Sequence, residues 1–167
     1  MYVMSFFFRD HHVLYVKRVN APLQDVLKLL RDPHAFMGLS PLIISVSTDP
    51  ADSTKHTVVD ELILPFGYRT KITYHARITL HDDGMLASSQ AGAGTNTVSR
   101  YCASAISENE TEVVEHVTVN SFFLLLPFIK GVIAKAHLET LDRLAAKLEG
   151  PRIDVLSVVV SEQLQTK

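Results

Sequence analysis

At 167 residues, the chain has the length of a single domain that can bury a sizeable hydrophobic core. Hydrophobic residues make up 47% of the chain and charged residues 20%, a composition that excludes a disordered protein. The formal net charge of −2 gives no electrostatic attraction to DNA or RNA, so no nucleic-acid partner is expected.

The N-terminal stretch MYVMSFFF is apolar, but it is short and is followed directly by Arg9 and Asp10. It lacks the basic leader of a signal peptide and the length of a membrane span. Cys102 is the single cysteine and cannot form an internal disulfide, which suits a reducing compartment. We therefore expect a cytoplasmic protein without stable membrane insertion.

The first third of the chain predicts a strand, two small helices and a second strand. Residues 12–19 (HVLYVKRV) are rich in β-branched and aromatic side chains, as strands are. Residues 20–33 then carry a proline near the start of an apolar helical pattern and an Asp-Pro pair at its end. A short helical turn over residues 34–39 and a strand over residues 42–47 follow.

The middle of the chain predicts a run of strands joined by tight turns. In residues 72–80, apolar residues alternate with polar ones, which indicates a strand with one buried face. Aspartate and glycine over residues 82–84 are typical of a hairpin turn. The expected strands cover residues 56–64, 68–80, 85–91, 98–106 and 111–121.

Residues 128–148 predict the last element, an amphipathic helix about 30 Å long at ~1.5 Å per residue. Pro127 suits the first helical turn, and Gly150 suits a left-handed helix stop. A histidine lies in the middle of the apolar face. That face consists of Ile133, His137, Leu141, Leu144 and Leu148.

A run of antiparallel strands followed by one long amphipathic helix predicts an α+β fold, with the helix lying across the concave face of a curved sheet. After Gly150, the segment VLSVVV is strand-like. It either pairs with a sheet edge or with a second subunit, which would make a homodimer possible, or it forms a frayed terminus.

The strings VNAPLQDVLKLLRDPHAFMGLSPLI (residues 19–43) and IAKAHLETLDRLAAKLE (residues 133–149) resemble the START-like, or SRPBCC, superfamily. This superfamily includes polyketide cyclases/dehydrases, lipid-transfer domains and proteins of the birch-pollen-allergen type. The resemblance implies a helix-grip fold, in which about seven strands wrap around the last helix and leave a deep apolar cavity. It implies one ligand-binding domain over residues 8–149, an N-terminal extension over residues 1–7 and a tail over residues 150–167. No short catalytic motif is shared across the superfamily, so no active site can be transferred.

Hairpin registers predict which residues line the cavity, because cross-strand partners share a face. We pair Leu80 with Met85 in the first hairpin and Ile106 with Thr111 in the second. Both apolar faces should then look at the long helix. The predicted cavity wall comprises Tyr74, Ala76, Ile78, Ala87, Ser89, Val98, Cys102, Val117, Lys130, Ile133 and Leu141.

The same registers place two charges, Arg100 and Glu115, on the inward faces of the second hairpin. A buried charge is costly unless it is paired, so they form either a structural ion pair or polar groups that act on a ligand. A slip of one residue would turn them outward. His137 is either a satisfied core residue or an acid–base group of the cavity wall.

Three further side chains leave alternatives open. Lys130 either binds an acidic ligand group at the cavity mouth or extends into water. Asp60 and Glu61 are adjacent, so one of them faces inward, and the sequence leaves open which one.

Metal and phosphate motifs receive no support. The eight histidines have no spacing typical of a metal site, so neither a metal nor another cofactor is expected. The segment AGAGTN (residues 91–96) does not join a strand to a helix, so it predicts a flexible loop at the cavity rim and not a phosphate-binding loop.

A hydrophobic cavity with a few polar groups predicts binding of a hydrophobic small molecule. Together with the resemblance, this favours a cofactor-independent polyketide cyclase/dehydratase-type enzyme of secondary metabolism. In it, His137 or Glu115 would move a proton, and Arg100 or Tyr74 would stabilise an enolate. The alternative is a non-catalytic carrier of a lipid or sterol-like ligand.

Overall fold

The computed structural model describes residues 7–150, apart from the side chains of residues 65 and 93. Ten helices and strands follow one another, with short 3-10 turns at Pro65–Gly67 and Gly92–Gly94. They are β1 (Phe8–Val19), α1 (Leu23–Leu30), α2 (Pro33–Met37), β2 (Ile43–Asp49), β3 (Asp52–Ile63), β4 (Arg69–His81), β5 (Gly84–Gln90), β6 (Asn96–Ser107), β7 (Glu110–Phe122) and α3 (Leu126–Glu149).

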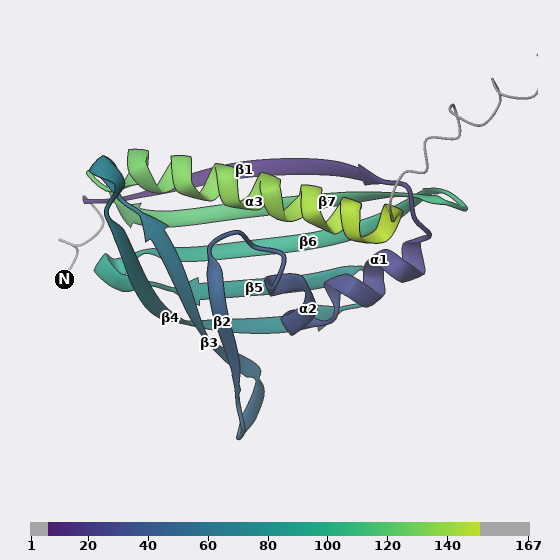
Figure 1. Ribbon diagram of the computed structural model, residues 1–167, viewed down its shortest axis with the longest axis horizontal. Helices are drawn as coiled ribbons and strands as arrows, with labels where there is room; N and C mark the ends of the chain where they lie inside the picture. The colour runs from purple at the N-terminus through teal and green to yellow at the C-terminus, as the bar shows by residue number, and fades with distance from the viewer. Residues whose placement is uncertain (1–6, 151–167) are drawn as a thin grey trace, which may run out of the picture.

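The strands form one antiparallel sheet of seven strands in the order β1-β7-β6-β5-β4-β3-β2. The sheet curves strongly, and α3 lies across it (Figure 1). The two short helices, α1 and α2, lie beside the C-terminal half of α3. The predicted α+β helix-grip fold is therefore confirmed.

The long helix α3 begins and ends where its sequence indicates. Pro127 lies in its first turn, and Gly150 ends it with a φ of 69°. A left-handed backbone angle of this kind suits glycine, which has no Cβ to clash with the preceding turn. The helix extends the predicted range by two residues at its start and one at its end.

The hydrophobic core fills only part of the space between the sheet and the helices. Side chains from β1, α1, β7 and the C-terminal half of α3 are fully buried there, for example Val19, Leu30, Val113 and Leu144. Burying a side chain of this size stabilises the fold by roughly 1.5–3 kcal/mol. The N-terminal half of α3 faces a cavity instead.

Helix α2 closes one side of that cavity and is tied to the sheet by a polar link. His34 Nε2 lies 2.8 Å from Thr48 Oγ1, and the same hydroxyl lies 3.2 Å from Nδ1 of buried His56. Burial, and secondarily the neighbouring His34, lowers the pKa of His56. The link holds Phe36 and Met37 of α2 at the cavity wall.

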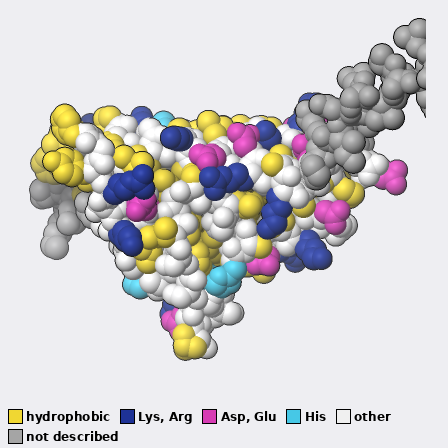
Figure 2. Space-filling model, viewed as in Figure 1, with side chains coloured by type: hydrophobic (Ala, Val, Ile, Leu, Met, Phe, Trp, Pro, Cys, Tyr) yellow, Lys and Arg dark blue, Asp and Glu magenta, His cyan; other side chains and the backbone are white. Residues whose placement is uncertain are grey.

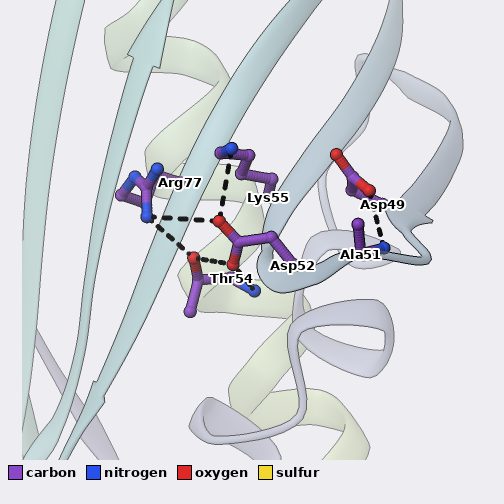
Figure 3. Close-up of polar contacts among 6 residues, drawn as sticks. All are labelled: Asp49, Ala51, Asp52, Thr54, Lys55 and Arg77. Atoms are coloured by element: carbon purple, nitrogen blue, oxygen red, sulfur yellow. Dashed lines mark hydrogen bonds and ion pairs between the residues drawn. The ribbon is translucent and has the colours of Figure 1, made fainter.

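The hairpin of β2 and β3 projects from the body of the molecule, and a set of polar contacts stabilises its end (Figure 3). Asp52 Oδ1 accepts hydrogen bonds from the backbone N–H (3.0 Å) and the hydroxyl (2.6 Å) of Thr54. Lys55 and Arg77 lie 3.4 and 3.6 Å from the other oxygen. The Thr54 hydroxyl is the main reason that the pKa of Asp52 falls to about 2.

The two hairpins used to predict the cavity wall differ in outcome. Leu80 pairs with Met85, as predicted. Thr111, however, pairs with Ala105, because β6 and β7 are joined by a two-residue turn and a β-bulge leaves Ile106 out of register. Every β6 position upstream of the bulge is therefore turned to the opposite face.

The ends of the chain lie largely outside the described residues. The described elements span Phe8–Glu149, and the role of this range as one domain stays a prediction. The pairing of the predicted tail, residues 150–167, also stays a prediction, because Gly150 is the one residue of this segment that the structure describes. No helix in residues 7–150 is long and apolar enough to cross a membrane.

Candidate functional site

A cavity of about 620 Å³ lies between the N-terminal half of α3 and the inner faces of β3, β4, β5 and β6. Small side chains on β4 and β5 leave the space open, since alanine and serine stand where a filled core would carry larger residues. Seven residues predicted for the site line this cavity. They are Tyr74, Ala76, Ile78, Ala87, Ser89, Ile133 and His137.

Three predicted site residues on β6 lie outside the cavity, which corrects the prediction. Val98, Arg100 and Cys102 point away from it because of the bulge before the β6–β7 turn. Arg100 Nη1 donates to the backbone oxygens of Met85 (3.2 Å) and Tyr101 (2.7 Å), and Nη2 pairs with Asp83. Arg100 is therefore a structural clamp on the β4–β5 turn and does not contact Glu115.

Three other predicted wall residues also lie elsewhere. Val117 and Leu141 are buried in the core, at 1% and 2% exposure, and do not border the cavity. Lys130 is exposed and borders a second pocket of about 410 Å³, which lies between β1 and α3 and also includes His11. This exposure agrees with the interpretation that Lys130 extends into water. Lys130 is not among the residues that line the main cavity, where it would bind an acidic ligand group.

The structure brings His137 and Glu115 together at the inner wall of the cavity. His137 Nδ1 binds Glu115 Oε1, and the Glu115 side chain is completely buried. The Tyr101 hydroxyl lies 3.5 Å from the same nitrogen, and the Tyr15 ring stacks on the imidazole with centroids 6.0 Å apart. His137 is held in a fixed orientation by these contacts.

This pairing determines the chemistry open to the histidine. When Nδ1–H donates to a carboxylate, Nε2 is the basic nitrogen of the ring. No hydrogen bond to Nε2 occurs within residues 7–150, so it is available to a ligand. Oε2 of Glu115 is buried without a partner among these residues, and a buried carboxylate oxygen of this kind is a costly arrangement.

The tyrosines near this pair stay protonated at neutral pH. Burial, and after it the Glu115 carboxylate, raises the pKa of Tyr101 well above its ordinary value. The same two causes, in the same order, raise the pKa of Tyr15. Tyr101, which lines the cavity, is thus a neutral hydrogen-bond donor.

On the opposite wall, Asp60 faces the cavity, and Glu61 faces outward. Asp60 is 8% exposed and accepts a hydrogen bond from the Tyr74 hydroxyl at 3.3 Å. Burial raises the pKa of Asp60 to about 6 despite this bond. Glu61 instead pairs with Arg69 at 2.8 Å. This settles the alternative that the sequence left open.

Tyr101, Ser99 and Thr140 also line the cavity, and none of them was predicted from the sequence. Tyr101 and Ser99 follow from the corrected register of β6. Thr140 lies one turn beyond Ala136 on the same helix face, and its hydroxyl donates to the Ala136 carbonyl at 2.7 Å. Thr140 follows Ile133 by about two helical turns, so helical periodicity could have placed it on the same, cavity-facing side of α3.

Hydrophobic side chains gather at the end of the molecule where the β3–β4 turn meets the start of α3 (Figure 2). Leu64 of the turn and Leu125 before the helix both border the cavity there. Phe66, Tyr68 and Leu124 are 99%, 71% and 66% exposed. Exposed apolar side chains therefore lie beside this end of the cavity.

Within the described part of the chain, no group of three or more His, Cys, Asp and Glu side chains is arranged to hold a metal ion. The polar groups of the cavity wall are thus the oriented imidazole of His137, neutral hydroxyls and the Asp60 carboxyl. Such groups can accept or donate protons and form directional hydrogen bonds inside an apolar space.

Comparison with known proteins identifies a matching family model and, among solved structures, a shared fold. The family model described as "Domain of unknown function (DUF7053)" matches residues 19–150. A search of curated proteins found no match.

Several solved structures share the architecture. The Zhui aromatase/cyclase from Streptomyces sp. R1128 has a TM-score of 0.70 at 13% identity, over 84% of this chain and 94% of that one. A START superfamily protein from Mycobacterium smegmatis has a TM-score of 0.65 at 12% identity, over 83% and 97%. The di-domain ARO/CYC BexL of the BE-7585A biosynthetic pathway has a TM-score of 0.63 at 11% identity, over 84% and 50%. These likenesses confirm the START-like, or SRPBCC, helix-grip fold.

Proposed function

The chain belongs to the DUF7053 family of domains of unknown function, and we propose that it binds a hydrophobic small molecule between its sheet and α3. The observation that carries this proposal is an apolar cavity of about 620 Å³ whose inner wall carries His137, paired with the buried Glu115 carboxylate. Pockets of this size and character bind small molecules in many proteins. We take residues 8–149 as the binding domain.

We further propose that the cavity catalyses a cofactor-independent cyclisation or dehydration of a polyketide-like substrate. In a dehydration, His137 Nε2 removes the proton from the carbon next to a carbonyl. The electron pair left behind forms the new double bond, and the hydroxyl on the next carbon leaves as water after it receives that proton from the His137 imidazolium, which returns the imidazole to its neutral form. Glu115 orients the imidazole and stabilises its protonated form.

The enolate that develops in this reaction needs a hydrogen-bond donor. The sequence assigned this task to Arg100 or Tyr74, and Arg100 lies outside the cavity. The neutral hydroxyl of Tyr101, beside His137, takes its place in our proposal. A donor positioned in an apolar site stabilises such a charge more than it would in water.

A model substrate tests the chemistry. The 3-hydroxydecanoyl thioester of N-acetylcysteamine loses water to give an enoyl thioester, whose absorbance reports the rate. We expect His137→Ala and Glu115→Gln to lower this rate by roughly 100-fold or more, as for loss of a general acid–base group or its partner. His116→Ala is the matched control, because His116 follows Glu115 on β7 but is exposed.

Binding of the neutral dye Nile red should survive in all three variants. A wild-type protein that binds Nile red but does not speed the elimination, or variants with unchanged rates, would remove His137 and Glu115 from this proposed mechanism.

The alternative, a non-catalytic carrier of a lipid or sterol-like ligand, is favoured by the exposed apolar residues next to Leu64 and Leu125, which line one end of the cavity. Phe66 and Leu124 are placed where a carrier would meet a lipid surface while it exchanges its ligand. Transfer of the fluorescent sterol dehydroergosterol between vesicles tests this function. Wild-type transfer that Phe66→Ser slows, together with no elimination activity, would favour the carrier over the enzyme.

A further inference from the structure

Asp60 is a carboxyl group of the cavity wall that the proposed chemistry does not use. Asp60 is 8% exposed and lies on the inner face of β3. The Tyr74 hydroxyl donates to its Oδ1 at 3.3 Å. Within residues 7–150, no lysine, arginine or histidine lies within ion-pair distance of Asp60, whereas Glu61 next to it is paired with Arg69 at 2.8 Å.

The charges around the cavity are unbalanced. The lining contains no lysine and no arginine among the described residues. His137 is already paired with Glu115, so it offers no free positive charge to a ligand. An ionised Asp60 is therefore left without a counter-charge, and a buried unpaired charge is unfavourable.

We infer that Asp60 is a specificity-determining residue that selects apolar ligands carrying a hydrogen-bond donor, with a protonated amine preferred, and that excludes carboxylic acids. This inference rests on the proposed function, since it requires that the cavity binds a ligand. A ligand ammonium would supply the missing positive charge, and a hydroxyl would supply a hydrogen bond alone. A ligand carboxylate would meet Asp60 with no cation to separate the two charges.

Protonation of Asp60 gives the preference a pH dependence. Burial raises the pKa of Asp60 to about 6, and the Tyr74 hydroxyl is the one polar side chain hydrogen-bonded to it within residues 7–150. At pH 7.5 the carboxylate is mostly ionised and attracts a cation. At pH 5 it is mostly neutral, so the preference for an amine over an alcohol should shrink.

Three probes of equal chain length test the inference. Decylamine, decanol and decanoate are each titrated against protein with bound Nile red at pH 7.5, below the concentrations at which the probes form micelles. For the wild type we expect decylamine to displace the dye at a concentration at least 10-fold lower than decanoate, with decanol between them.

Asp60→Asn keeps the size of the side chain and the acceptor for Tyr74 but removes the charge. In this variant the apparent affinity for decylamine should fall about 10-fold, and the apparent affinity for decanol should stay within about 2-fold of the wild-type value. Glu61→Gln is the matched control, since Glu61 is adjacent but faces outward, and it should retain the wild-type order.

The outcomes separate this inference from the proposed function. Three results would overturn the role of Asp60 if the dye binds: equal displacement by all three probes, no displacement, or an order of probes that Asp60→Asn does not change. Each of them would leave the binding cavity itself in place. Absence of Nile red binding in the wild type would contradict the ligand-binding function itself, and the inference would fall with it.

Discussion

Asp60→Asn should stabilise the protein at neutral pH and have little effect at acid pH. The folded protein binds a proton at Asp60 more tightly than the unfolded chain does, because burial raises the pKa from 3.8 to about 6. By linkage, the contribution of Asp60 to the free energy of unfolding is fully present below about pH 4. It is lost as the pH rises through about 6 and the buried carboxyl ionises. The asparagine variant has no such loss.

The size of the effect follows from the shift in pKa. A change of roughly two units, at about 1.36 kcal/mol per unit, gives an upper bound of about 3 kcal/mol. Because the carboxyl borders a cavity that opens to water, solvent screening reduces the cost, and we expect a gain of about 1–2 kcal/mol at pH 7.5.

Urea denaturation followed by far-UV circular dichroism measures this difference. The wild type, Asp60→Asn and Glu61→Gln are compared at pH 4.5, 5.5, 6.5 and 7.5. The free energy of unfolding of Asp60→Asn should rise relative to the wild type across this range, while that of Glu61→Gln should not. A constant difference between Asp60→Asn and the wild type at all four pH values would refute the reasoning.

Three further substitutions, with Leu138→Ala as a control for one of them, test the fold and the cavity. Gly84→Ala should destabilise the protein by about 3 kcal/mol or more, because a Cβ at this φ of 151° would lie 2.2 Å from the Tyr101 carbonyl oxygen. Leu144→Ala should cost about 2–5 kcal/mol in urea denaturation, whereas Leu138→Ala, which is 51% exposed in the wild type, should cost under about 1 kcal/mol. Ala87→Trp should abolish Nile red binding by filling the cavity while the circular dichroism spectrum is kept, and unchanged dye affinity would place the dye elsewhere.

The order of elements and one hairpin register could be predicted because local signals determine them. The Asp-Asp-Gly turn sets the β4–β5 pairing, and alternation along β4 then places Tyr74, Ala76 and Ile78 on the cavity face. The apolar face of α3 likewise placed His137 toward the sheet.

The register of β6 could not be predicted in the same way. A cavity wall carries polar and small residues, so Ser99 and Tyr101 face inward while apolar Val98 and Cys102 face outward. The usual rule that the apolar face of a strand is the buried face then gives the wrong answer. A bulge near the turn, with no glycine to mark it, decides the register instead.

The polar partners of the site depend on long-range geometry. Glu115 was expected to pair with Arg100, yet it binds His137, 22 residues further along the chain. Asp60 could not be distinguished from Glu61 because adjacent strand residues face opposite sides, and the choice needs the β3–β4 register. That register pairs Glu61 with Lys71 and brings Arg69 within reach of its carboxylate on the outer face.

Methyl NMR of isoleucine-labelled protein titrated with Nile red tests whether the cavity between the sheet and α3 is the binding site. The δ1 methyl signals of Ile72, Ile78 and Ile133, which line the cavity, should shift on addition of the dye. Those of Ile44 and Ile106, which are 51% and 44% exposed away from the cavity, should stay in place. Shifts confined to Ile44 or Ile106, or none at any of the five, would contradict the proposed function.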